Sequence, residues 1–158
     1  MSGEGRPAEE RIDGSGLRVA IVHGTWHPVI AAGLLAGARR VLADAGATVE
    51  EHPVPGSFEL PVVAKAALEA GADAAVALGV IIRGGTPHFE FVSSAATDGI
   101  TRVALDTGKP VGFGVLTLDD EAQGLDRAGL PGSREDKGAE AATAALLTAI
   151  RLRTIRGA

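Results

Sequence analysis

A candidate for acid–base chemistry, His88, follows a glycine turn that could bind phosphate. Gly84 and Gly85 form that turn after an apolar run, with Thr86 as candidate N-cap and Pro87 as first residue of the next helix. Free N–H groups at a helix start favour an anion, and glycines let a phosphate approach the backbone closely. A neutral-range pKa suits a histidine there to general acid–base catalysis. Position alone leaves open a plain strand-to-helix turn and a structural histidine.

Three side chains in neighbouring loops could contact a substrate. Trp26 could stack on a flat heterocycle, although a lone tryptophan is more often a core or interface anchor. His27 beside it could contact substrate or simply open a helix. Glu59 could accept hydrogen bonds from a polyol, although the helix dipole already favours a carboxylate in a first helical turn.

Two cations, Arg127 and Lys137, flank a glycine- and proline-containing linker at residues 129–133. Both could bind an anion, and either could be an ordinary solvated charge. The sequence of one chain does not show whether they reach the strand-end loops that carry the other candidates. The sequence lacks the glycine fingerprint of dinucleotide sites, the nucleoside-triphosphate P-loop, H-E-x-x-H and G-x-S-x-G, which disfavours those four chemistries.

Apolar runs and helical patterns alternate along the chain and must position these residues. The predicted strands are residues 17–23, 48–54, 73–82 and 111–117, and the predicted helices are residues 29–45, 58–70, 87–106, 119–128 and 135–153. The alternation predicts an α/β fold with right-handed crossovers and a parallel sheet covered on both faces. Ligands bind at the carboxyl ends of such strands, so the loops there form the expected functional edge.

Composition limits the possible partners and compartment. The net charge of −5 disfavours nucleic acid and anionic membranes, and the absence of cysteine fits a reducing cytoplasm. No apolar run reaches the ~18 residues of a membrane span, and the polar start has no signal-peptide core. Residues 1–16 are expected to be an arm or a disordered lead-in, and residues 17–158 a single domain. The 46% hydrophobic content hints at buried subunit interfaces.

Taken together, these residues resemble the lumazine synthase family. The matching segments lie in order at residues 54–61 (VPGSFELP), 79–89 (GVIIRGGTPHF), 114–117 (GVLT), 123–129 (QGLDRAG) and 137–142 (KGAEAA). The resemblance implies a flavodoxin-like three-layer αβα sandwich with a four-stranded parallel sheet. It also implies a homopentamer, or an assembly of pentamers, whose active sites lie between adjacent subunits. The linker at residues 130–135 is longer than in capsid-forming members and favours a pentamer over a sixty-subunit shell.

The resemblance implies a role for each matching position. His88 would transfer protons. The uracil and its ribityl chain would be held by Trp26, Ser57, Phe58, Glu59, Val80, Ile81 and Ile82, joined from the neighbouring subunit by Phe113 and Lys137. Phosphate would be held by Gly84, Gly85 and Thr86 with Arg127 from that neighbour, and His27 is a candidate for a further phosphate contact.

The implied reaction condenses 5-amino-6-(D-ribitylamino)uracil with 3,4-dihydroxy-2-butanone 4-phosphate to 6,7-dimethyl-8-ribityllumazine, releasing phosphate and water. It requires no metal or redox cofactor. Two alternatives from other functional classes stay open: a flavin- or lumazine-binding module without turnover, and an oligomeric scaffold.

Overall fold

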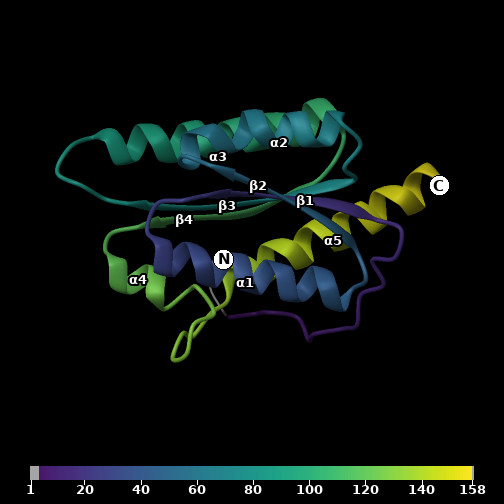
Figure 1. The fold of residues 1–158 in the computed structure, drawn as a ribbon, viewed down its shortest axis with the longest axis horizontal. Coiled ribbons are helices and arrows are strands. Elements are labelled where there is room, and N and C mark those ends of the chain that lie inside the picture. The colour runs from purple at the N-terminus through teal and green to yellow at the C-terminus, as the bar shows by residue number, and fades with distance from the viewer. Residues whose placement is uncertain (1–3, 158) are drawn as a thin grey trace.

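Four parallel strands form one sheet between two helical layers in the computed structural model, which describes residues 4–157 (Figure 1). The strands are β1 (Arg18–Gly24), β2 (Thr48–Val54), β3 (Ala74–Ile82) and β4 (Val111–Leu118), in the sheet order β2-β1-β3-β4. The helices are α1 (Pro28–Asp44), α2 (Leu60–Glu69), α3 (His88–Thr107), α4 (Glu121–Leu125) and α5 (Lys137–Arg156), with a short 3₁₀ turn η1 (Ser57–Glu59) before α2. The predicted alternation of strands and helices and the flavodoxin-like sandwich are confirmed.

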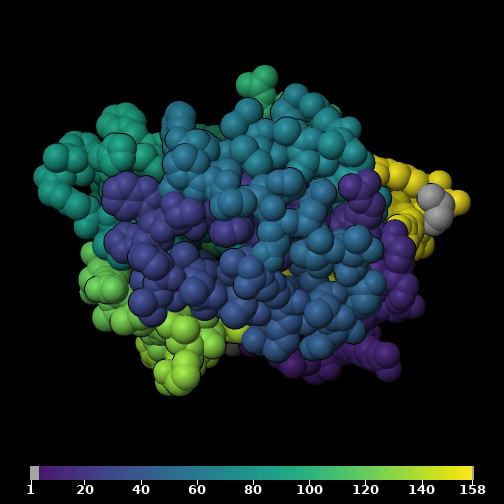
Figure 2. Space-filling model, viewed as in Figure 1, coloured from purple at the N-terminus to yellow at the C-terminus, as the bar shows by residue number. Residues whose placement is uncertain are grey.

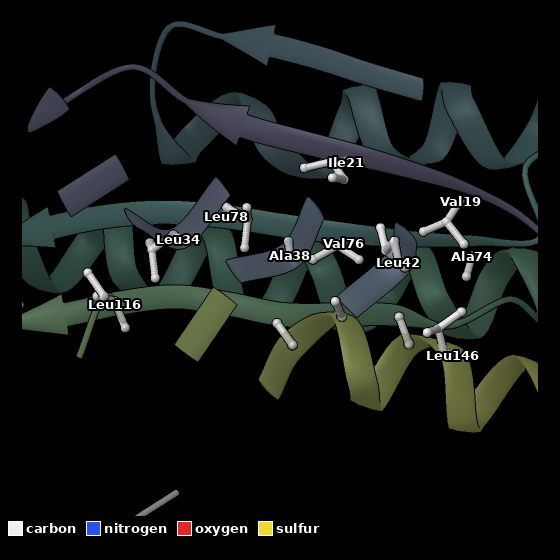
Figure 3. Packing of buried hydrophobic residues seen from close by; sticks show 14 of the residues in the cluster. Val19, Ile21, Leu34, Ala38, Leu42, Ala74, Val76, Leu78, Leu116 and Leu146 are labelled. Atoms are coloured by element: carbon white, nitrogen blue, oxygen red, sulfur yellow. The ribbon is translucent and has the colours of Figure 1, made fainter. Parts of the chain in front are cut away.

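The sheet separates two apolar cores. On one face α1 and α5 pack together, and on the other α2 and α3 do so (Figure 1). In Figure 3, Leu34 and Leu42 of α1 and Leu146 of α5 lie against Val76 and Leu78 of β3. The strand β3 is buried on both faces, as its unbroken apolar run predicts for the centre of a parallel sheet.

Helices α1 and α5 approach so closely that glycine is required between them. A Cβ on Gly138 would overlap the backbone carbonyl of Leu34, and a Cβ on Gly37 would overlap the Asp136 side chain. The contact therefore fixes the start of α5, with Lys137, against the middle of α1.

Helix boundaries differ from prediction where a side chain caps the helix. The last helix begins at Lys137, not at 135, because Asp136 accepts a hydrogen bond of 3.0 Å from the Ala139 N–H. The predicted helix 119–128 is limited to α4, whose N-cap Asp120 accepts from the Gln123 N–H. Residues 126–136 instead form a folded loop closed by an antiparallel bridge between Ala128 and Asp136.

Residues 4–16 run along the α1 and α5 side of the domain without forming a helix or strand. Gly14 donates its N–H to the Ala45 carbonyl at 2.7 Å, and Ile12 packs against the core. The rest of the predicted arm, residues 1–3, lies outside the described residues, as does residue 158 at the end of the predicted domain. Within residues 4–157 no helix is long and apolar enough to cross a membrane.

Candidate active site at the strand ends

The carboxyl ends of the parallel strands meet at one edge of the sheet, on the left in Figure 1. Three of the loops at this edge carry predicted site residues. Trp26 follows β1, Ser57 follows β2, and His88 follows β3 at the start of α3. Segments far apart in the sequence are thus brought to the same edge, as predicted.

The loops after β1 and β2 contact each other. The indole of Trp26 lies 3.5 Å from the point where a Cβ on Gly56 would stand, and Thr25 Oγ1 donates to the Pro55 carbonyl at 3.2 Å. Trp26 is nevertheless 67% exposed, so its ring faces space that a partner or ligand could fill. Trp26 is therefore not a core anchor of this chain, whereas stacking on a substrate and a position in a subunit interface both stay predictions.

His27 has a backbone conformation that L-residues rarely adopt. It is the only non-glycine residue among residues 4–157 with a positive φ, at 56°, and it occupies the N-cap position of α1 without a side-chain capping bond. Such a conformation costs about 1–2 kcal/mol. The surrounding structure must hold His27 in this conformation, and this fixes the backbone of the loop between β1 and α1 next to Trp26.

The 3₁₀ turn after β2 places three predicted residues in different surroundings. Ser57 is 7% exposed and lies against Gly79 of β3, where any larger side chain would collide with the Ser57 hydroxyl. Phe58 is exposed. Glu59 Oε2 accepts the Gly56 N–H at 3.1 Å, so the structural role considered for this carboxylate is present, and the polyol contact stays a prediction.

The glycine turn after β3 is open on all sides. Val80 and Ile81 are buried and Ile82 is half-buried, but Gly84, Gly85, Thr86 and His88 are all exposed. A Cβ on either glycine would meet nothing within 4 Å, and neither glycine has a positive φ. Neither a left-handed φ nor a steric clash therefore demands glycine at these two positions, and close approach of a phosphate to the turn stays a prediction.

The first turn of α3 differs by one residue from the prediction. Pro87, and not Thr86, is the N-cap, although Thr86 Oγ1 still accepts the His88 N–H at 3.4 Å. His88 is the first residue of α3 and lies directly beside the turn, as predicted.

Sequence reasoning missed Arg83, which stands between β3 and the glycine turn. Its Nε lies 3.0 Å from Asp119 Oδ1, its Nη1 lies 2.5 Å from Glu90 Oε1, and its Cζ lies 4.3 Å from the centre of the Phe89 ring. The hydrogen bond from Arg83 holds the pKa of Glu90 below its usual value. The only sequence feature that could have pointed to Arg83 is a single charged residue between an apolar strand and a glycine turn.

Arg127 and Lys137 lie on the other helical layer. Arg127 follows α4 and donates from Nη1 to the Gln123 carbonyl at 2.9 Å, while Lys137 begins α5. The sheet separates both helices from α3, which begins with His88 (Figure 1). Phe113 on β4 is half-exposed at 48%. A single chain therefore does not bring these residues to His88.

The two cations share one carboxylate. Glu135 Oε2 lies 3.5 Å from Arg127 Nε, and Glu135 Oε1 lies 3.2 Å from Lys137 Nζ, which also lies 2.8 Å from Glu140. Burial lowers the pKa of Lys137, but hydrogen bonds to Glu140 and Glu135 outweigh burial, and the net pKa is raised. Lys137 is thus held as a cation, and Glu135 is a second residue that sequence reasoning missed.

Comparison with known proteins gives a consistent family. The sequence model described as 6,7-dimethyl-8-ribityllumazine synthase matches residues 16–153. The chain is 77% identical over 158 residues to the 6,7-dimethyl-8-ribityllumazine synthase of Leifsonia xyli subsp. xyli, an alignment covering 99% of this chain and 100% of the relative. It is 70% identical to the protein of the same name from Clavibacter michiganensis subsp. michiganensis, with 100% of both chains covered. The protein of that name from Nocardioides sp. is 58% identical, with 98% of this chain and 97% of the relative covered.

Proposed function

The chain belongs to the 6,7-dimethyl-8-ribityllumazine synthase family. We therefore propose that it forms 6,7-dimethyl-8-ribityllumazine from 5-amino-6-(D-ribitylamino)uracil and 3,4-dihydroxy-2-butanone 4-phosphate in riboflavin biosynthesis. The observation that carries this proposal is the meeting of three loops at one sheet edge. This edge carries an exposed tryptophan, a 3₁₀ turn with a buried serine, and a glycine turn next to a histidine. These groups match an aromatic ring, a polyol and a phosphate, respectively.

The reaction needs two bound substrates and a proton shuttle. The 5-amino group attacks the ketone, a C–N bond forms, and the carbonyl oxygen leaves as water to give an imine. Loss of a proton from the neighbouring carbon then cleaves the C–O bond to phosphate, which leaves as inorganic phosphate, and the resulting enol becomes a ketone. The ribitylamino nitrogen attacks this ketone to close the second ring, and the ketone oxygen departs as the second water. Holding the two substrates face to face supplies most of the acceleration, since a bimolecular step becomes effectively unimolecular.

His88 is proposed to move protons between the reacting nitrogen and the leaving oxygen groups. Its place at the exposed start of α3, beside the turn of Gly84 and Gly85, keeps the imidazole next to the proposed phosphate position. An imidazole can accept a proton in one step and donate it in the next. Trp26 would stack on the uracil, with Val80, Ile81 and Ile82 forming the apolar end of β3 beneath it, and Ser57, Phe58 and Glu59 would hold the ribityl chain.

The active site is proposed to be shared between adjacent subunits of a homopentamer. Within one chain the sheet lies between His88 and the cations Arg127 and Lys137, so a second copy must supply them if they bind substrate. Phe58, Phe91 and Phe113 are large apolar side chains left exposed on the isolated chain, which supports burial against a neighbour. Phe113 and Lys137 would close the uracil site, and Arg127 would join Gly84, Gly85 and Thr86 at the phosphate, with His27 as a further candidate.

The same proposal extends to organisation and location. Residues 17–158 would act as one domain, with the preceding residues as an arm. The cysteine-free sequence and the biosynthetic family support a cytoplasmic location.

The test is to mix the purified protein with both substrates and follow the absorbance and fluorescence of the lumazine. We expect product to form in proportion to protein, above the slow spontaneous reaction. A yellow protein that retains bound riboflavin without any excess turnover would favour the binding-module alternative and overturn the proposal.

A further inference from the structure

We propose that Arg83 is a positioning residue that holds the glycine turn in its phosphate-binding shape, without itself contacting phosphate. This inference rests on the proposed function, which assigns phosphate to the turn of Gly84, Gly85 and Thr86. It concerns a residue to which neither the motifs nor the comparisons assign a role.

The ion pairs of Arg83 join three elements around the turn. The residue follows β3, Asp119 follows β4, and Glu90 lies in the first turn of α3. The Arg83 N–H also donates to the Leu118 carbonyl at 2.8 Å, so both the backbone and the side chain of this residue attach it to the end of β4. The Phe89 ring covers one face of the guanidinium.

The pair between Arg83 and Glu90 closes the ends of the turn on each other. The turn and His88 lie between these two residues in the chain, and Figure 2 shows this segment projecting from the left side of the molecule. Gly84 and Gly85 have open space around them, and the 3.4 Å bond from the His88 N–H to Thr86 is long. A turn with so little packing depends on attachment of its two ends, because an unattached loop samples more conformations.

Charge gives Arg83 a second effect on the same turn. Without its guanidinium, the carboxylates of Glu90 and Asp119 would stand uncompensated beside a bound phosphate dianion. Two of its nitrogens are engaged by these carboxylates and one face is covered by Phe89, which favours a positioning role over direct contact with phosphate. It therefore acts through its neighbours.

The ion pairs themselves add little to global stability. The side chains of Arg83, Glu90 and Asp119 are 46%, 56% and 67% exposed, and exposed pairs are screened by solvent. Variants of these residues should fold, so their effect on substrate binding can be measured separately.

The experiment compares Arg83→Met and Glu90→Gln with a control variant, Arg102→Met. The control breaks an exposed ion pair between Arg102 and Asp106, which both lie on α3. We expect the KM for the butanone phosphate to rise about tenfold in Arg83→Met, with the KM for the uracil within about twofold of wild type. Glu90→Gln should raise the same KM by a smaller factor. This sign is diagnostic, because removing a negative charge near phosphate would otherwise lower that KM.

The outcomes that would overturn the proposal are specific. A lowered or unchanged KM for the butanone phosphate in Glu90→Gln would make Arg83 at most a direct phosphate ligand. Equal changes in both KM values together with a lowered thermal midpoint would make it an ordinary structural residue. An unchanged KM in Arg83→Met would remove it from the site.

Failure of the proposed function would be seen separately in the wild-type protein. If the wild type forms no product, inorganic phosphate binding is measured by calorimetry in the same variants. Weaker binding in both Arg83→Met and Glu90→Gln than in Arg102→Met would then support the positioning role without the synthase reaction. Equal binding in Arg83→Met and Arg102→Met, or unweakened binding in Glu90→Gln, would overturn it.

Discussion

Arg127 and Lys137 are joined through a single carboxylate, because Glu135 lies 3.5 Å from the first and 3.2 Å from the second. Glu135 is mostly buried, with a side-chain exposure of 16%, and Lys137 is more so at 13%. Both cations are proposed to reach the substrate of a neighbouring subunit. The carboxylate that pairs with both cations therefore helps to set their orientation and, together with Glu140, keeps Lys137 charged.

Glu135→Gln should shift the alkaline limb of the pH profile to lower pH. Hydrogen bonds to Glu140 and Glu135 raise the pKa of Lys137 against the lowering effect of burial, so loss of one carboxylate lowers that pKa. Lys137 then loses its proton at a lower pH, and uracil binding weakens there. The measurement is kcat/KM for the uracil against pH, with Glu69→Gln on α2 as the control. If the alkaline limb of this profile does not shift in Glu135→Gln, the charge of Lys137 has no part in uracil binding.

His88→Ala should reduce kcat by about a hundredfold, the lower end of the range for general acid–base catalysis. The reaction also proceeds spontaneously, and the bound substrates still gain from proximity. His88 is exposed, so the thermal midpoint should stay near that of wild type. Steady-state kinetics and thermal unfolding of the same preparation check both statements. Turnover within twofold of wild type would remove His88 from proton transfer.

Alanine at Gly84 should affect substrate binding, whereas alanine at Gly138 should affect stability. Gly84→Ala should leave stability unchanged, because its Cβ meets nothing within 4 Å, and should raise the KM for the butanone phosphate by occupying the space proposed for phosphate. Gly138→Ala should destabilise the protein by about 1–3 kcal/mol or more, because its Cβ would overlap the Leu34 carbonyl. Urea unfolding and steady-state kinetics report both effects. A Gly84→Ala variant with normal KM would contradict the phosphate assignment of the turn.

Stability should fall as the pH is lowered below about 6.5. Burial lowers the pKa of His23 from its usual 6.5. The charge of Glu51 raises this pKa and the charge of Arg39 lowers it, but neither outweighs burial. The unfolded chain therefore binds the proton first, and acid favours unfolding in this window. The hydrogen bond from Arg39 lowers the pKa of Glu51 from 4.5, which adds a further loss of stability below that pH.

The measurement is the unfolding free energy in urea between pH 4 and 8 at fixed protein concentration. His23→Gln should flatten the part of the curve just below pH 6.5, and Glu51→Gln the part below about pH 4.5. A wild-type curve that rises toward acid pH would contradict both assignments.

The secondary structure was largely predictable because single-chain patterns determine it. Apolar runs buried on both faces predict β1 and β3, and helical spacing predicts α1 and α3. Most boundaries agree within one or two residues. The sheet edge that carries the site follows from parallel topology alone.

The side-chain contacts beyond that edge could not be predicted from the sequence. The loop at residues 126–136 depends on a bridge between Ala128 and Asp136 and on the close contact of α1 with α5. Arg83 and Asp119 are 36 residues apart, and only the pairing of β3 with β4 brings them together. Glu135 acquires its role from the fold of that loop, since it lies eight residues after Arg127 and not at the i+3 or i+4 spacing at which helical side chains meet.

The most direct test of the central claim, condensation at a site shared by two copies of the chain, is complementation between variants. His88→Ala and Arg127→Ala subunits are co-expressed with different tags and purified as mixed assemblies. They are assayed at a butanone phosphate concentration well below the KM of the second variant. A shared site predicts that activity reappears at about a quarter of the sites, where an intact His88 faces an intact Arg127. Mixed assemblies no more active than the average of the two separate variants would contradict a site built from both subunits.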